Sequence, residues 1–452
     1  MAVQPKQWSV FVYMAGENDL SENGELDLRE MKKVGSTDHV NIIVQFDRAG
    51  LGAKKSTRRL FIMRGNIRTI KSLGPTECGD PQVLQEFLSW GMQAYPAQHY
   101  AVILWNHGNG WGAENIYRAA RKARLKVRAE RKVKETPAIL PEHRVSIIPE
   151  RHLLKLLHGP LRRSLFRNTV AAAVKAKAIS TDDDARDFLD SVELKRVFSR
   201  VVQRAGRPFD ILGMDACLMN MIETAYQLRG TVQWCIGSEQ TEPSDGWPYG
   251  QILSGLIRNP SMTPPDVASL IVDTYLTAYA DSEPVTLSAL NFGPNDQRLL
   301  ELKDRIDRLS MTLVDACRTT SACQLVMAAR HRAQWYENPA YVDLYHLCRL
   351  LADSPPGRRV NEAALGILEI LNVPGPEGFI LREGHKGWEM TGSHGVSVYF
   401  PEDYLSPLYA TLDFAADTHW ETFLATILKG IGRPVVRHPE HETLKTTAQA
   451  LL

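Results

Sequence analysis

In the first half of the chain, short apolar runs of strand length alternate with stretches that have polar or helical spacing. Between the third and fourth runs, PQVLQEFLSWGMQAY carries apolar residues at helical intervals. Strands that alternate with helices predict a mostly parallel sheet covered by helices on both faces. In such sheets, functional side chains gather at the carboxyl ends of the strands. The strand-like runs cover 8–16, 40–47, 58–65, 100–106, 209–215 and 232–239.

From about residue 260 the pattern becomes mostly helical, with one late strand expected in HGVSVYF (394–400). We therefore expect a second, smaller α/β domain after the main one. The expected division is a main α/β domain over 1–116 and 179–259, a basic insertion over 117–178, a second mixed α/β domain over 260–430 and a tail over 431–452.

The insertion is the most unusual part of the composition. Residues 118–178 contain 17 Lys and Arg against 4 Glu, although the whole chain has a formal net charge of only +1. The rest of the chain is therefore acidic. The insertion has little apolar surface to bury, so we expect an exposed segment that interrupts the sheet pattern.

Several classes of protein are disfavoured. No run approaches the roughly 18 apolar residues that a membrane span needs, so no membrane partner is expected. The N-terminal stretch MAVQPKQWSVFVYMAG is typical of a strand and not of a signal peptide. The six cysteines show no CxxC and no zinc spacing, which favours reduced thiols. We expect a cytoplasmic protein.

Two stretches end an apolar run with a reactive side chain. YAVILWNHGNGW (100–111) presents His107 before a glycine, and FDILGMDACLMNMIE (209–223) presents Cys217. A cysteine becomes nucleophilic as a thiolate, which a histidine or a helix N-terminus stabilises. The apolar spacing predicts a helix from Cys217, with Asp215 as its N-cap. The N–H groups of Gly108 and Cys217 could stabilise an oxyanion. Taken singly, Cys217 is more simply interpreted as a small buried core residue, and His107 as a histidine without a catalytic role.

Whole motifs decide between these interpretations. YMAGENDL, GDPQVLQEFLSWGMQAYPAQHYAVILWNHGNGWG, FDILGMDACLMNMIETAYQLRG, SEQTEPSDGWPYGQIL, YVDLYHL and HGVSVYFP occur in this order. From about residue 8 to 425, apart from the insertion, the chain resembles the clostripain family of cysteine peptidases (family C11, clan CD). The resemblance implies a caspase-like three-layer sandwich around a mostly parallel central sheet.

The resemblance also implies a Cys217–His107 dyad that acts through an acyl-enzyme. The family cuts after Arg and sometimes Lys, a preference that needs carboxylates in the S1 pocket. Asp215 matches the family position for this role, and Asp245 in PSDGW is a second candidate. For Asp215 the helix N-cap role is compatible with this one. For Asp245 the alternative is a turn aspartate before glycine.

The insertion lies where relatives are cut for activation, between the histidine and cysteine strands. The resemblance therefore implies a pro-segment that the enzyme itself or an upstream protease could cleave, with Arg128, Arg131 and Lys134 as example sites. An intracellular defence or cell-death cascade would fit. The alternative is a catalytically silent scaffold that binds nucleic acid or an acidic partner through the basic arm. Scarce aromatics, with Tyr117 alone beside the arginine run, argue against nucleic acid.

No cofactor is expected to be required. TDDDARD could offer Asp182, Asp183 and Asp184 to Ca²⁺, and some relatives depend on calcium. The stretch lacks the spacing and the glycine of a calcium-binding loop, which favours a solvated acidic loop.

Overall fold

The computed structural model describes residues 4–16, 20–48, 56–74, 76, 78–106, 111 and 191–432. Its centre is a nine-stranded sheet in the order β10-β8-β7-β6-β5-β1-β2-β3-β4. None of the helices in these ranges is long and apolar enough to cross a membrane. The strands are β1 (Lys6–Gly16), β2 (Val40–Arg48), β3 (Ser56–Met63), β4 (Asn66–Gly74), β5 (Ala97–Trp105), β6 (Phe209–Asp215), β7 (Val232–Gly237), β8 (Thr286–Asn291) and β10 (Ile380–His385).

The middle of the sheet is parallel, as the sequence predicts. β2, β1, β5, β6 and β7 run in one direction, and their carboxyl ends meet at one edge. These strands are nearly continuous apolar runs and are buried on both faces, the pattern expected of a parallel sheet between helices. The flanking strands β3, β4, β8 and β10 pair antiparallel.

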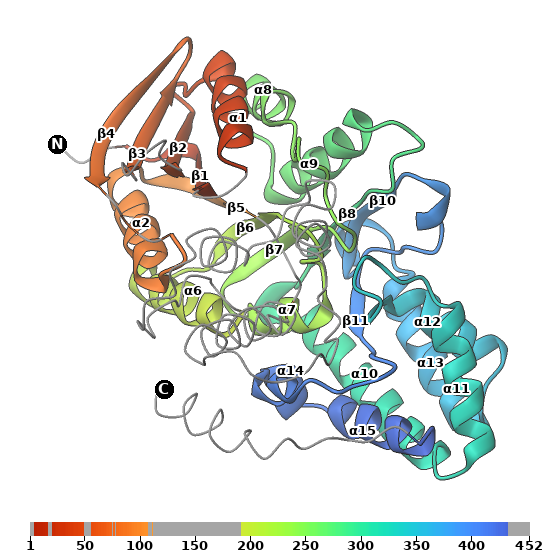
Figure 1. Ribbon diagram of the computed structural model, residues 1–452. Helices are drawn as coiled ribbons and strands as arrows, with labels where there is room; N and C mark the ends of the chain where they lie inside the picture. Colours follow the sequence, from red (N-terminus) through yellow and green to blue (C-terminus); the bar gives the residue numbers. More distant parts are fainter. Residues whose placement is uncertain are drawn as a thin grey trace, which may run out of the picture.

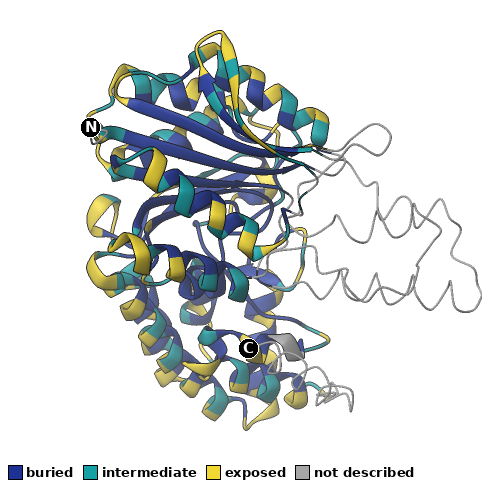
Figure 2. Cartoon of the chain, turned by 90° about the vertical axis from the view of Figure 1, so that its left-hand side faces the viewer, coloured by how far each residue is buried: buried dark blue, intermediate teal, exposed yellow. Residues whose placement is uncertain are grey.

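Helices cover both faces of the sheet, which makes a three-layer sandwich (Figure 1). Side chains of α1, α8 and α9 share one buried cluster with one face of the strands. Side chains of α2, α6 and α7 share the other. Figure 2 shows the buried strands between helices whose outer faces are exposed. The bounds are α1 (Ser21–Val34), α2 (Pro81–Ala94), α6 (Ser191–Ala205), α7 (Ile222–Gln227), α8 (Tyr249–Arg258) and α9 (Pro264–Ala278).

The C-terminal part is mostly helical, as expected, and packs beside the sandwich (Figure 1). Two of its strands, β8 and β10, nevertheless join the central sheet. The division at residue 260 therefore stays a proposal about folding units, because the sheet runs across it. The remaining elements are η1 (Pro294–Asp296), α10 (Gln297–Ala316), α11 (Thr320–Arg332), β9 (Tyr341–Asp343), α12 (Leu344–Asp353), α13 (Arg358–Leu371), η2 (Gly375–Glu377), η3 (Trp388–Met390), β11 (Ser397–Tyr399), η4 (Pro407–Thr411), α14 (Asp413–Ala416) and α15 (Trp420–Gly430).

Candidate active site

The two predicted reactive stretches leave the sheet side by side. β5 and β6 are parallel neighbours, and Trp105 is in register with Asp215. The N–H of Asn106 donates to the carbonyl of Asp215 at 3.4 Å. His107 and Cys217 each follow this register pair by two residues in the sequence. The residues of the sequence predictions that lie outside the described ranges are His107, Gly108, Arg128, Arg131, Lys134, Asp182, Asp183 and Asp184.

The predicted helix at Cys217 is wrong. After β6 ends at Asp215, the chain makes a turn at Cys217, and α7 begins only at Ile222 with Met221 as its N-cap. Asp215 is the last strand residue and caps no helix. The apolar spacing that predicts a helix here has another cause, because the whole segment is buried. Cys217 therefore gains no stabilisation from a helix N-terminus.

A non-helical backbone holds Cys217 instead. The segment after the cysteine runs beside the continuation of β7, where the N–H of Leu218 donates to the carbonyl of Gln240 at 3.1 Å. Leu218 has a φ of 63°, a left-handed conformation that costs a leucine about 1 kcal/mol or more. Strained backbone of this kind clusters at functional sites, which makes the turn at Cys217 a candidate for one.

The peptide of Glu242 contacts the sulfur directly. Its N–H donates to Cys217 Sγ at 3.2 Å, and the Cys217 thiol donates to its carbonyl oxygen at 3.8 Å. An N–H that points at sulfur stabilises negative charge there, and the thiolate is the attacking form. The sequence motif EPSDGWPY contains Glu242, but no local pattern predicts that its backbone meets a cysteine 25 positions earlier.

Asp215 lies on the face of the sheet that α8 and α9 cover, and it is fully buried. The hydroxyl of Tyr249, the first residue of α8, donates to Asp215 Oδ2 at 2.8 Å. Two residues earlier in β6, a Cβ on Gly213 would come within 2.7 Å of the Trp247 ring. The absence of that Cβ lets Trp247 pack on the strand and brings Tyr249 to the carboxylate.

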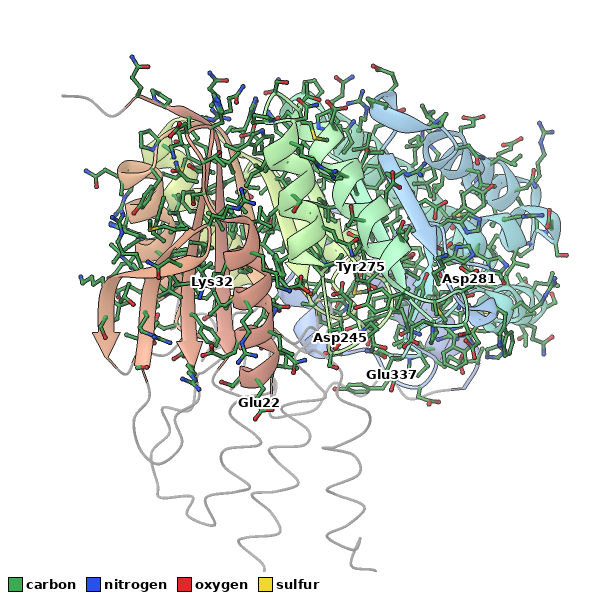
Figure 3. The ribbon with its side chains drawn as sticks, turned by 90° about the horizontal axis from the view of Figure 1, so that it is seen from above. Glu22, Lys32, Asp245, Tyr275, Asp281 and Glu337 are labelled. Carbon is green, nitrogen blue, oxygen red and sulfur yellow. The ribbon has the colours of Figure 1, made fainter. Side chains whose placement is uncertain are left out.

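Asp245 lies at the tip of a tight turn and is exposed. The N–H of Gly246 donates to the carbonyl of Pro243 at 3.1 Å, and Gly246 has a φ of 61°, which favours glycine. In the view of Figure 3, Asp245 lies nearer the edge of the molecule than Tyr275. The geometry therefore separates a buried carboxylate, Asp215, from an exposed one, Asp245.

A second segment, around Gly395, packs against the chain that follows Cys217. The side-chain amide of Asn220 donates to the carbonyl of Gly395 at 2.8 Å and also contacts Ser288. The N–H of Gly395 donates to Glu239 Oε2 at 3.0 Å. Burial, together with the nearby Asp343 carboxylate, raises the pKa of Glu239 well above its usual range. Sequence reasoning missed this contact.

Within the described ranges, no group of three or more His, Cys, Asp or Glu could hold a metal ion. Two open surface hollows, of about 540 and 770 Å³, lie along α8 and α9, and neither is lined by Cys217 or Asp215. Cys217 itself is only 2% exposed. The site is therefore closed in this structure.

Comparisons with known proteins identify the family and the fold. The model of the clostripain family matches residues 12–123 and 167–426. A secreted C11 cysteine protease from Bacteroides thetaiotaomicron, solved with an irreversible peptide inhibitor, is 19% identical with a TM-score of 0.56, over 92% of this chain and 99% of that one. An inactive zymogen C11 protease from Parabacteroides distasonis is 17% identical with a TM-score of 0.59, over 92% and 99%. At these identities the structures show the fold. No curated protein matches the sequence.

Proposed function

The chain belongs to the clostripain family and is a cysteine peptidase, and we propose that it is an endopeptidase that cuts after Arg or Lys with Cys217 as nucleophile and His107 as general acid and base. The observation that carries this assignment is the register of Trp105 with Asp215. It makes the residues that lead to His107 and to Cys217 neighbours at the carboxyl edge of the sheet.

The proposed chemistry follows from these positions. The Cys217 thiolate attacks the carbonyl carbon of the scissile peptide, and the N–H groups of Gly108 and Cys217 stabilise the oxyanion. His107 donates a proton to the leaving amine, which leaves an acyl-enzyme. His107 then takes a proton from water, and the resulting hydroxide releases the acid product and regenerates the thiolate. The proton that His107 donates comes from the Cys217 thiol, and the N–H of Glu242 on Sγ would stabilise the thiolate that is left.

Substrate choice is proposed to depend on Asp215, with Asp245 nearer the surface. A buried carboxylate takes an arginine guanidinium in a paired, charge-assisted contact. The complete burial of Asp215 supports a strong preference, because the attraction between a buried carboxylate and a cationic P1 side chain is weakly screened by water. Peptides with Arg or Lys at P1 are the proposed partners.

The basic insertion over 117–178 is proposed to be an activation segment, cut by the enzyme itself or by an upstream protease near sites such as Arg128, Arg131 or Lys134. The relative from Parabacteroides distasonis is described as an inactive zymogen, which supports a zymogen here. The sequence favours the cytoplasm and an intracellular cascade, whereas the Bacteroides thetaiotaomicron relative is secreted. Location and pathway stay proposals.

The test is the initial rate on reporter peptides that end in Arg, Lys or Asp, for wild type and Cys217→Ala. A denaturing gel of both proteins follows the insertion, and parallel assays with EDTA or added Ca²⁺ test calcium dependence. Turnover after Arg or Lys that the variant lacks would support the proposal, and clipping in wild type alone would show self-activation. Turnover after Asp would contradict the role of Asp215. If wild type stays silent even after trypsin trims the insertion, the silent-scaffold alternative is favoured.

A further inference from the structure

One buried hydroxyl near the cysteine has no hydrogen-bond partner among the described residues. Tyr275 lies on the buried face of α9 and is 0% exposed. Among the residues that the structure describes, it is the only tyrosine whose buried hydroxyl lacks a partner. Other buried tyrosines show the usual rule, since Tyr249 donates to Asp215 and Tyr409 donates to Glu223. An unpaired buried hydroxyl costs about as much as a lost hydrogen bond, so it calls for an explanation.

The surroundings of this hydroxyl are acidic and aromatic. Burial raises the pKa of Tyr275 well above its usual value, and the charges of Glu242, Tyr279, Asp215 and Cys217 act in the same direction. The phenol therefore keeps its proton over the working pH range. The ring of Tyr279 lies 4.8 Å from that of Tyr275, and the Tyr279 hydroxyl donates to the carbonyl of Gly246 at 2.7 Å.

These contacts indicate which kind of ligand could form the missing hydrogen bond with the Tyr275 hydroxyl. The two buried carboxylates, Asp215 and Glu242, would repel an anionic group and attract a cation. Arginine and lysine head groups carry only donors, so the phenol oxygen would act as the acceptor. Aromatic rings also suit a planar guanidinium, which stacks on them.

We propose that Tyr275 is a specificity-determining residue of the S1 pocket, whose hydroxyl oxygen accepts a hydrogen bond from the cationic head group of the P1 residue beside Asp215 and Glu242. This inference rests on the proposed function, since it assigns the P1 side chain to the α9 face of β6. Figure 3 shows Tyr275 further inside the molecule than the exposed Asp245.

The first experiment compares wild type with Tyr275→Phe on peptides with P1 arginine and P1 norleucine, an apolar side chain that carries no hydrogen-bond donor. We expect kcat/KM on the arginine peptide to fall roughly tenfold, the loss expected for a hydrogen bond to a charged group. The rate on the norleucine peptide and the alkylation of Cys217 by iodoacetamide should not change. The thermal midpoint should not fall, because the variant removes an unpaired hydroxyl.

Tyr100→Phe is the matched control. The Tyr100 hydroxyl accepts a hydrogen bond from the N–H of Ala97 at 3.0 Å, near the amino-terminal end of β5. Its loss should lower the thermal midpoint and leave kcat/KM unchanged. Equal losses on the arginine and norleucine peptides in Tyr275→Phe would overturn the inference, as would an unchanged arginine rate.

A binding measurement separates this inference from the proposed function. Benzamidine, an aromatic amidine cation, is titrated calorimetrically into Cys217→Ala and into the double variant that also carries Tyr275→Phe. Weaker binding by the double variant supports the role of Tyr275 even if wild type cuts no peptide, which would contradict only the proposed function. Equal dissociation constants, or no binding to either protein, overturn the inference.

Discussion

The buried carboxyl of Glu223 gives a prediction whose size follows from the structure. Glu223 lies on α7, just after the cysteine turn, and is fully buried. Its Oε1 accepts from the N–H of Tyr399 and from the hydroxyl of Tyr409, each at 2.9 Å, whereas its Oε2 has no partner among the described residues. Burial, opposed only in part by these donors, raises the pKa of Glu223 from 4.5 to about 7.

The direction of the pH dependence follows from this shift. Between pH 4.5 and about 7 the folded protein keeps a proton that the unfolded chain has released. The contribution of Glu223 to the free energy of unfolding is therefore complete below pH 4.5, is lost as the pH rises to about 7, and is constant above that. At about 1.4 kcal/mol per pH unit, the loss is about 3 kcal/mol.

Glu223→Gln removes this titration and keeps the shape of the side chain. The variant and wild type should have similar unfolding free energies near pH 4.5, and the variant should be about 3 kcal/mol more stable at pH 8. Urea denaturation at pH 5, 6, 7 and 8 measures the difference. Glu377→Gln, at a side chain that is 88% exposed, controls for the loss of one surface charge. A difference between Glu223→Gln and wild type that is the same at pH 5 and pH 8 would refute the reasoning.

Three further substitutions test the site and its support. Tyr249→Phe removes the donor to Asp215. We expect urea denaturation to show a loss of about 1–3 kcal/mol in the free energy of unfolding, and kcat/KM on arginine peptides to fall. An unchanged kcat/KM would contradict a role of Asp215 in specificity. Gly213→Ala places a methyl group against the Trp247 ring. Thermal unfolding should show a loss of about 1–3 kcal/mol in the free energy of unfolding, with changed tryptophan fluorescence. An unchanged thermal midpoint would show that the close contact is not destabilising. Asp80→Ala removes the N-cap of α2 and should cost about 1 kcal/mol at unaltered kcat/KM, because α2 contributes no residue to the site.

Much of the sheet could be predicted because apolar runs mark strands that are buried on both faces. β1, β2, β5 and β6 coincide with such runs to within a few residues. β4 gives no such signal, since NIRTIKSLG forms the edge of the sheet and its side chains are mostly exposed or half-buried. The apolar spacing from Cys217 onward predicts a helix that the structure does not have. The true course of this stretch depends on hydrogen bonds to Ser238 and Gln240, which local periodicity does not contain.

The sequence by itself determined the family, the parallel core of the sheet and the place of Cys217 directly after β6, because these depend on local periodicity and on motifs. Only the tertiary structure decided what surrounds the cysteine and the aspartate. Two of these contacts join residues 25 or more positions apart: the N–H of Glu242 donates to Cys217, and the hydroxyl of Tyr249 donates to Asp215. The Tyr275 hydroxyl, which has no partner among the described residues, is buried where such distant residues meet. Contacts of this kind exist only once β6, α8 and α9 have packed together, since packing brings side chains near one another that no local pattern relates.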